Sequence, residues 1–372
     1  MAAMAAPRPA PLLLVCSLAA QAFAAPSLAA QADADALAER LDAPFRASFP
    51  ADEPGAAVVV SRAGETLLRR GYGLASLELQ VAIEPDHVFC LASVTKPFTA
   101  MAVLALVEDG EIALTDPARR FLPDLELDER VTIEHLLSHT AGIPDFTTLP
   151  GFDHDHIHER VEPDELCRAA KGAEPSFAPG AEMRYGNVHY ALLARIVEVV
   201  SERPWEEFVR ARICEPAGMT RTAYGGHYRV VPGLVTAYAQ DGDDDAWRRA
   251  RPVSMTRGYG LGGLCSTVDD LARWADAFLA GRILAPATVA RMQSTPTLAD
   301  GTRSEYALGF YVREVRGHRF VYHAGGIYGW RAMVVLIPEK AVVCAVLTNR
   351  DSDDNRVANL ATGAAALVAG RP

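Results

Sequence analysis

The chain has 372 residues, 50% of them hydrophobic and 22% charged, which is enough to bury a sizeable core. Its formal net charge is −11 at pH 7, because 47 Asp and Glu residues outnumber 36 Lys and Arg residues. Such a surface repels phosphate backbones and anionic lipid, so we expect no nucleic-acid partner and no role at a membrane surface.

The first 30 residues carry the pattern of a secretory signal. Arg8 precedes an apolar run over 12–24, and small-residue sites follow, such as "AFA" at 22–24. The run is too short for a stable membrane anchor, and no later apolar run is long enough to span a bilayer. We therefore expect 1–30 to be removed, at a site that the sequence does not fix, and the mature chain to be exported, either periplasmic or secreted. Cys16 leaves lipidation open.

The cysteines do not form the spacing of a disulfide framework or of a metal site. There are six of them: Cys16, Cys90, Cys167, Cys214, Cys265 and Cys344. Five remain after removal of the signal, and their wide scatter favours buried, small hydrophobic side chains. Outside the cytoplasm one pair could oxidise, but the sequence does not identify it.

The predicted elements begin with an amphipathic helix over 33–49, where Leu37 and Leu41 are four residues apart. The next stretch, "GAAVVVSRAGETLLRRGYG" at 55–73, predicts a β-hairpin with its turn at 63–65. From about 95 to 280 the apolar spacing is helical, as in "FTAMAVLALVEDG" and "TVDDLARWADAFLAG". Glycines after these segments are typical of helix C-termini.

Strand patterns return near the end of the chain. "HRFVYHAGG", "RAMVVLI" and "AVVCAVLTN" predict three strands, and "RVANLATGAAALVAG" predicts a closing helix. We therefore expect an α+β fold, in which an antiparallel sheet built from both chain ends is flanked by the terminal helices. One domain over 31–372 would consist of an α/β lobe, about 33–90 and 305–372, and an inserted, mainly helical lobe, about 91–304.

The segment "VFCLASVTKPFTAM" at 88–101 carries the first candidate catalytic residues. It contains Lys96, one of only three lysines in the chain, three residues after Ser93. In a helical turn the two side chains lie on one face, with Cβ atoms roughly 5–6 Å apart. A serine hydroxyl needs a base to become nucleophilic, and a buried lysine can be that base, whereas an arginine cannot lose its proton. The motif alone is weak, because an N-cap serine followed by an exposed lysine has the same spacing.

Two further segments add chemistry that fits this pair. Tyr185-Gly186-Asn187 precedes a predicted helix, where a tyrosine can relay a proton and an asparagine can hold a substrate amide. His323-Ala324-Gly325-Gly326 ends a predicted strand, where glycines let a ligand approach the backbone and a free N–H can form half of an oxyanion hole. The structural alternatives are a packed aromatic, a helix cap and a bulge at a hairpin turn.

In this order and at these separations, Ser93-x-x-Lys96, Tyr185-x-Asn187 and His323-x-Gly325 resemble the motifs of the serine β-lactamase and penicillin-binding-protein superfamily. "LLSHTAGIPDF" and "GLGGLCSTVDDLARW" are also similar to family segments, and the resemblance covers roughly 35–365. It is strongest to the branch of class C β-lactamases, D-alanyl-D-alanine carboxypeptidases and related esterases, which implies a β-lactamase/transpeptidase-like fold.

The resemblance implies a role for each motif residue. Ser93 would form an acyl-enzyme, with Lys96 and Tyr185 as general acid and base. Asn187 would contact the substrate amide, and the backbone N–H groups of Ser93 and Gly326 would form the oxyanion hole. The implied substrate is a β-lactam, a D-amino-acid peptide or an ester, and no cofactor or metal is implied.

The third motif departs from many relatives, which have lysine where this chain has His323. A histidine supplies a weaker, pH-dependent charge for a substrate carboxylate, which disfavours efficient β-lactam hydrolysis. No counterpart of the glutamate of class A β-lactamases is assignable, so Tyr185 would assist deacylation.

Two alternative functions remain open from the sequence. A binding protein that senses peptidoglycan or a β-lactam would acylate without turnover. A metal-dependent hydrolase would need ligands from the segment "FDHDHIHER", in which a solvated loop is the favoured interpretation. The possible ligands there are Asp153, His154, Asp155, His156 and His158.

Overall fold

A computed structural model describes residues 28–145, 156–240, 244–315, 317–351 and 354–370. The predicted signal segment, 1–30, lies outside these ranges except for its last three residues. Within the described ranges, none of the helices combines the length and the apolar character needed to cross a lipid bilayer.

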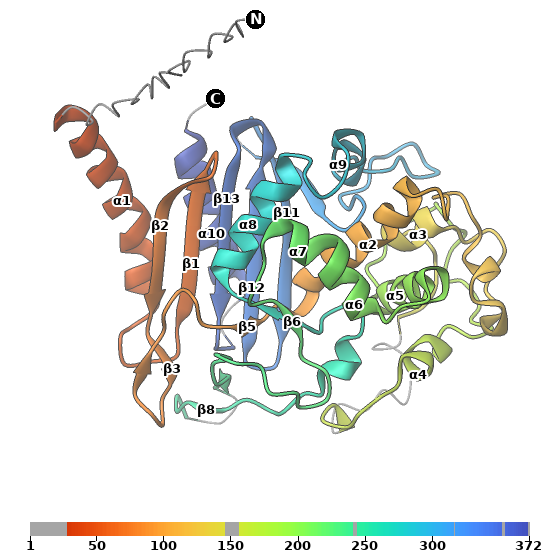
Figure 1. Ribbon diagram of the computed structural model, residues 1–372, viewed down its shortest axis with the longest axis horizontal. Coiled ribbons are helices and arrows are strands. Elements are labelled where there is room, and N and C mark those ends of the chain that lie inside the picture. Colours follow the sequence, from red (N-terminus) through yellow and green to blue (C-terminus); the bar gives the residue numbers. More distant parts are fainter. Residues whose placement is uncertain (1–27, 146–155, 241–243, 316, 352–353, 371–372) are drawn as a thin grey trace, which may run out of the picture.

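A six-stranded antiparallel sheet joins the two ends of the chain (Figure 1). Its strands, in sheet order, are β10 (Tyr311–Val315), β11 (His318–Ile327), β12 (Trp330–Ile337), β13 (Val342–Thr348), β1 (Ala56–Arg62) and β2 (Glu65–Tyr72). β1 pairs with β13 from Ala56↔Thr348 to Arg62↔Val342, which places the first strand beside the last. The predicted α+β class, with a sheet built from both chain ends, is confirmed.

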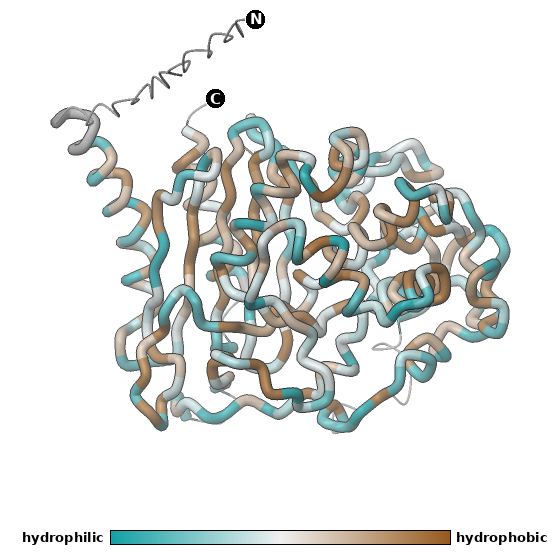
Figure 2. The backbone as a smooth tube through the Cα atoms, viewed as in Figure 1, coloured by the Kyte–Doolittle hydropathy of each residue, from teal (hydrophilic) through white to brown (hydrophobic). Residues whose placement is uncertain are grey.

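Helices cover both faces of this sheet, which explains why its central strands are almost continuously apolar. α1 (Leu28–Ser48) and α10 (Asp354–Ala369) cover one face, where Leu41 of α1 belongs to the same core as the strand residues Val58 and Val346. α8 (Val268–Leu279) covers the other face, where Val59 and Leu347 are buried. Alternate residues of β1 and β13 therefore enter two different cores. Figure 2 shows the hydrophobic strands in brown and the more hydrophilic outer loops in teal.

The β1–β2 hairpin turns at Ala63 and Gly64, whose φ angles are 52° and 80°. A two-residue turn with positive φ at both positions matches the right-handed twist of the flanking strands. The glycine therefore fits a conformation that most side chains avoid.

The middle of the chain is built around α2 (Lys96–Glu108), which is buried on nearly all sides. Besides α8, the other α-helices of this region are α3 (Ile133–Leu137), α4 (Pro163–Arg168), α5 (Asn187–Ser201), α6 (Trp205–Val209), α7 (Glu215–Ala217) and α9 (Pro286–Met292). It also contains short strands that the sequence did not predict: β5 (Phe89–Cys90), β6 (Ala223–Tyr224), β7 (Tyr238–Ala239), β8 (Arg248–Arg249) and β9 (Leu264–Ser266). A further pair, β3 (Leu74–Ser76) and β4 (Val81–Ala82), follows the hairpin. β5, which pairs with β9, ends shortly before the chain enters α2.

Candidate active site

A short 3₁₀ turn, η1 (Ala92–Thr95), links β5 to α2 and carries Ser93. Side chains three residues apart eclipse each other in 3₁₀ geometry, so Lys96, the first residue of α2, lies over Ser93. Its Nζ donates to Ser93 Oγ at 3.1 Å. The structure therefore brings these two residues together as their spacing predicts.

The Lys96 side chain is completely buried. Besides Ser93, its Nζ donates to Asn187 Oδ1 at 2.9 Å and to the Leu261 carbonyl oxygen at 3.0 Å. Burial disfavours the charged ammonium and lowers the pKa of Lys96 to about 7, against the opposing attraction of Asp145. A large fraction of Lys96 is thus neutral near pH 7 and able to accept a proton.

Tyr185 lies on the other side of this pair. Its ring centroid is 4.7 Å from Lys96 Nζ, and its hydroxyl interacts with Ser93. Burial raises the pKa of Tyr185 well above its usual value, and the interaction with Ser93 opposes that shift only in part. Near pH 7 the phenol is therefore protonated and in contact with the candidate nucleophile.

Asn187 is held in place by Asp145, a residue whose role the sequence did not reveal. Asp145 Oδ1 accepts from the backbone N–H groups of Asn187 at 2.9 Å and of Val188 at 3.2 Å, which caps the N-terminus of α5. Its Oδ2 accepts from Asn187 Nδ2 at 3.3 Å. This bond fixes the orientation of the amide, so that Asn187 Oδ1 faces Lys96. Asp145 lies within "LLSHTAGIPDF", but a capping residue 42 positions away has no local spacing by which it could be found.

Two buried histidines lie behind Tyr185-Gly186-Asn187 and were also missed by the sequence interpretation. His139 Nδ1 accepts from the Gly186 N–H at 3.3 Å and lies 2.9 Å from His189 Nδ1. A Cβ on Gly186 would lie 3.0 Å from the His189 ring, so the glycine leaves room for that ring. Burial lowers the pKa of both imidazoles, that of His189 to about 4, so the pair is uncharged at neutral pH and supports the motif by packing and hydrogen bonding.

The His323 side chain is buried in the protein. Its Nδ1 donates to the Ala324 carbonyl oxygen at 2.7 Å, and its Nε2 lies 3.1 Å from the Tyr306 hydroxyl, which can donate to it. Burial lowers the pKa of His323 to about 3, and the charge of Lys96 acts in the same direction. Near neutral pH the ring carries no charge, whereas the sequence predicted a partial, pH-dependent one.

Gly325 brings β11 against the backbone that carries Ser93. A Cβ at this position would lie 2.2 Å from the Leu91 carbonyl oxygen and 3.1 Å from the Ser93 nitrogen, so no larger residue fits without displacing η1. The next residue, Gly326, lines the same cavity as Ser93. The glycine-rich end of β11 and the N-terminus of η1 are thus adjacent.

Gly325→Ala is expected to lower the free energy of unfolding by about 2 kcal/mol, because the new methyl group overpacks against backbone atoms that cannot rotate away. Urea unfolding of the variant measures this change. Gly363→Ala in α10 is the matched control, since a Cβ there meets nothing within 4 Å and should raise helix stability by roughly 0.5–1 kcal/mol. Equal effects of the two substitutions would contradict the close approach at Gly325.

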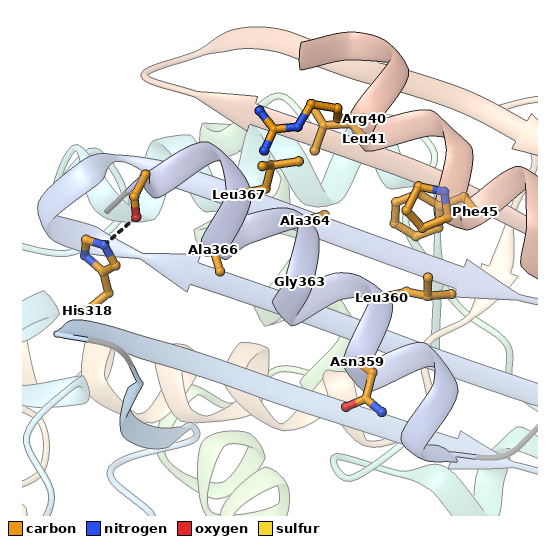
Figure 3. A pocket seen from close by; sticks show the side chains of 12 residues that line it. Arg40, Leu41, Phe45, His318, Asn359, Leu360, Gly363, Ala364, Ala366 and Leu367 are labelled. Atoms are coloured by element: carbon orange, nitrogen blue, oxygen red, sulfur yellow. Dashed lines mark hydrogen bonds between the residues drawn. The ribbon is translucent and has the colours of Figure 1, made fainter. Parts of the chain in front are cut away.

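A cavity of about 210 Å³ opens over Ser93. Its lining residues are Ala92, Ser93, Ile157, Leu166, Asn187, Val253, Arg257, Gly258, Leu261, Gly262, Gly326, Ile327 and Tyr328. A larger hollow of about 650 Å³ lies between α1 and α10, and Figure 3 shows its mainly aliphatic lining, with His318 bonded to a backbone oxygen. The lining residues of that hollow include no serine, cysteine or lysine, whereas the smaller cavity contains Ser93.

The segment of the possible metal ligands is only partly described. Asp153, His154 and Asp155 lie outside the described residues, and His156 approaches Glu159 at 3.9 Å. In the described part of the chain, no group of three or more His, Cys, Asp or Glu side chains is arranged to hold a metal ion.

Comparison with known proteins gives one family match over nearly the whole chain. The model of the beta-lactamase family matches residues 36–368. Among curated proteins, a D-aminopeptidase of Brucella anthropi is 30% identical over 283 residues, which are 75% of this chain and 52% of that protein. The chain therefore spans about half of the length of this relative.

Two solved structures of similar fold extend the comparison. An octameric penicillin-binding protein homologue from Pyrococcus abyssi has a TM-score of 0.75 and 26% identity, covering 91% of this chain and 78% of its own. A D-stereospecific amidohydrolase from Streptomyces sp. has a TM-score of 0.72 and 25% identity, covering 88% of this chain and 98% of its own.

Proposed function

The chain belongs to the beta-lactamase family, and on that premise we propose that it is a serine hydrolase that cleaves amide or ester carbonyls through an acyl-enzyme on Ser93. The family resemblance predicted from the three motifs is confirmed by the same match. The observation that carries the proposal is the contact between Ser93 Oγ and the buried Lys96 Nζ, 3.1 Å apart, where burial leaves the amine able to take up a proton.

In the proposed acylation step, neutral Lys96 removes the proton of Ser93, and Ser93 Oγ attacks the substrate carbonyl. The negative charge that develops on the carbonyl oxygen would be stabilised by the backbone N–H groups of Ser93 and Gly326, which border the same cavity. The proposal assigns the leaving-group proton to Tyr185, whose phenol is protonated near pH 7 and contacts Ser93.

Substrate binding is assigned to Asn187 and to the strand segment from His323 to Gly326. Asn187 Nδ2, oriented by Asp145, would contact a substrate carbonyl, while Gly325 lets the strand lie close to the nucleophile. His323 would act by supporting this strand through Tyr306, without supplying a charge. In deacylation, Lys96 and Tyr185 would activate a water molecule on the acyl-enzyme.

The rate should rise with pH through the titration of Lys96. The ammonium form cannot act as a base, so kcat/KM is expected to fall about tenfold per pH unit below the lysine pKa and to reach a plateau above it. With that pKa at about 7, the half-maximal value is expected near pH 7. Initial rates on an uncharged p-nitrophenyl ester between pH 5 and 9 measure the profile. A flat profile from pH 5 to 8 would mean that no group with this pKa acts as the base.

For the substrate, we propose a D-amino-acid amide or peptide as the first candidate. The relatives named D-aminopeptidase and D-stereospecific amidohydrolase support this choice. The neutral His323 supports it as well, because efficient β-lactam hydrolysis was expected to need a charge at that position. Esters remain compatible with the same catalytic group.

A substrate panel tests the proposal. Nitrocefin, a D-alanyl-D-alanine peptide, a D-amino-acid amide and a p-nitrophenyl ester are each incubated with the protein and with Ser93→Ala. Repeated turnover that depends on Ser93 supports a hydrolase. A burst of one acylation per protein without turnover would instead support the sensing function, and loss of activity to a chelator with activity retained in Ser93→Ala would support a metal hydrolase.

The lobe boundaries and the export of the chain remain predictions. We propose that residues 31–372 act as one hydrolase domain in which the α/β lobe and the helical lobe meet at Ser93. Export to the periplasm or the medium rests on the composition of 1–30.

A further inference from the structure

Arg257 lies in the wall of the cavity that opens over Ser93. It belongs to a 3₁₀ turn, η7 (Met255–Gly258), whose backbone is firmly held. A Cβ on Gly258 would lie 2.6 Å from the Gly263 nitrogen, and Thr256 Oγ1 accepts from the Val161 N–H at 3.0 Å. The backbone that carries Arg257 is therefore held in a fixed position beside the cavity.

The charge of Arg257 is not balanced within the described part of the protein. No carboxylate there lies within 4.0 Å of its guanidinium, and its Nε is buried without a hydrogen-bond partner. By contrast, Arg195, also partly buried, pairs with Asp164 at 2.8 Å and with Glu198 at 3.1 Å. An arginine keeps its charge, and a buried donor without a partner costs free energy, so Arg257 has an unused capacity to bind an anion.

We propose that Arg257 binds a carboxylate of the substrate, and that this protein therefore prefers, among the D-amino-acid substrates proposed above, peptides with a free C-terminal carboxylate over amides. The inference rests on the proposed function, because it places the carboxylate in the cavity that contains Ser93. It assigns to Arg257 the charge that the sequence interpretation sought at His323, whose ring is buried against Tyr306. A planar guanidinium can hold a carboxylate through two parallel hydrogen bonds.

The test compares two ligands that differ only in charge, an N-acyl-D-alanyl-D-alanine and its C-terminal amide. Their dissociation constants are measured by calorimetry on Ser93→Ala protein, so that the readout does not depend on turnover. The carboxylate is expected to bind about 10- to 100-fold more tightly than the amide, as for a charge-assisted hydrogen-bonded pair. In the Ser93→Ala, Arg257→Gln double variant this ratio should fall to about 1, with partial recovery in Arg257→Lys.

Arg62→Gln on the same Ser93→Ala background is the matched control, because it removes the same charge from an exposed position at the end of β1. Three results would each overturn the inference. The ratio of the two dissociation constants could be near 1 in the presence of Arg257, it could persist in Arg257→Gln, or the carboxylate could show no measurable binding. Failure of the proposed function has a different signature, namely hydrolysis that survives Ser93→Ala.

A second, independent observation concerns two cysteines next to the catalytic turn. Cys90 on β5 and Cys265 on β9 are directly opposite each other, and their sulfur atoms are 3.2 Å apart. The Leu91 N–H donates to the Leu264 carbonyl oxygen at 2.8 Å. Leu91 and Leu264, the next pair along the two strands, are therefore a hydrogen-bonded pair. Cys90 and Cys265 then form a non-hydrogen-bonded pair, whose Cα atoms are typically about 4.5 Å apart, within the range that a disulfide bridges.

We infer that Cys90 and Cys265 are the pair that forms a disulfide under oxidising conditions. The two thiols lose two protons and two electrons as the sulfur–sulfur bond forms, and glutathione disulfide takes up both and becomes two glutathione thiols. The bond would tie the strand that ends three residues before Ser93 to the strand that follows the cavity residues Leu261 and Gly262.

Peptide mapping tests this inference on the full-length protein. One sample is incubated with glutathione disulfide and another is synthesised in an oxidising secretory compartment. Both are denatured in N-ethylmaleimide and digested. A linked peptide pair containing Cys90 and Cys265 is expected, with maleimide on Cys167, Cys214 and Cys344. Maleimide on Cys90 and Cys265 in both samples, or a link to another cysteine, would overturn the inference.

Discussion

Ser93→Ala is expected to lower kcat/KM at least about 10⁴-fold for every substrate that the protein hydrolyses, because no acyl-enzyme can form without the hydroxyl. The side chains around it would stay in place, since Lys96 retains its bonds to Asn187 Oδ1 and to the Leu261 carbonyl oxygen. Steady-state rates on the substrate panel, together with the unfolding midpoint of the variant, separate lost chemistry from lost folding.

Ser176→Ala is the matched control for this experiment, because it removes the same hydroxyl from an exposed position outside the cavity. The control should retain the wild-type rate. Residual activity of Ser93→Ala above a hundredth of the wild-type value, on any substrate, would show that another group performs the attack.

Lys96→Arg is expected to lower kcat/KM about 10³-fold, within the range that general acid–base catalysis contributes. The substitution keeps the positive charge but removes the base, because a guanidinium does not lose its proton at any pH at which the protein folds. The loss of activity should therefore persist at high pH. A base whose pKa had only been raised would lose its proton there, and the rate would recover. The pH profile from 6 to 10 distinguishes these two outcomes.

Arginine is also larger than lysine, so folding has to be checked in this completely buried position. Lys96→Met removes the base without adding volume and should lose a similar factor. Lys171→Arg, an exposed lysine paired with Glu126 at 3.4 Å, should change nothing. If Lys96→Arg kept a tenth of the rate, Lys96 would not be the base.

The fold was largely predictable because its strongest determinants are local patterns. The apolar runs of β1, β12 and β13 and the Ala63-Gly64 turn specify strands and a hairpin by themselves. The short strands β5 and β9 were not predictable, since two or three residues carry no periodicity. Their pairing is set by the tertiary structure around Ser93.

The candidate site was predictable where adjacent residues carry the chemistry and hidden where distant residues support it. Ser93 and Lys96 lie within one turn, so their contact follows from spacing. Asp145 acts on Asn187 from 42 residues away, and the neutrality of His323 comes from burial and from Lys96. Arg257 could not be identified either, because its importance depends on the cavity that it lines and on the absence of a partner for its Nε among the described residues.

Covalent labelling is the most direct test of the claim that Ser93 is the nucleophile. The protein is treated with a reactive phosphonate ester and with a fluorescent penicillin, and the modified peptide is sequenced by mass spectrometry. We predict one phosphonate per chain, on Ser93, with labelling lost in Ser93→Ala and kept in Ser176→Ala. A label on any other residue, or a phosphonate adduct that survives Ser93→Ala at the wild-type rate, would contradict the account.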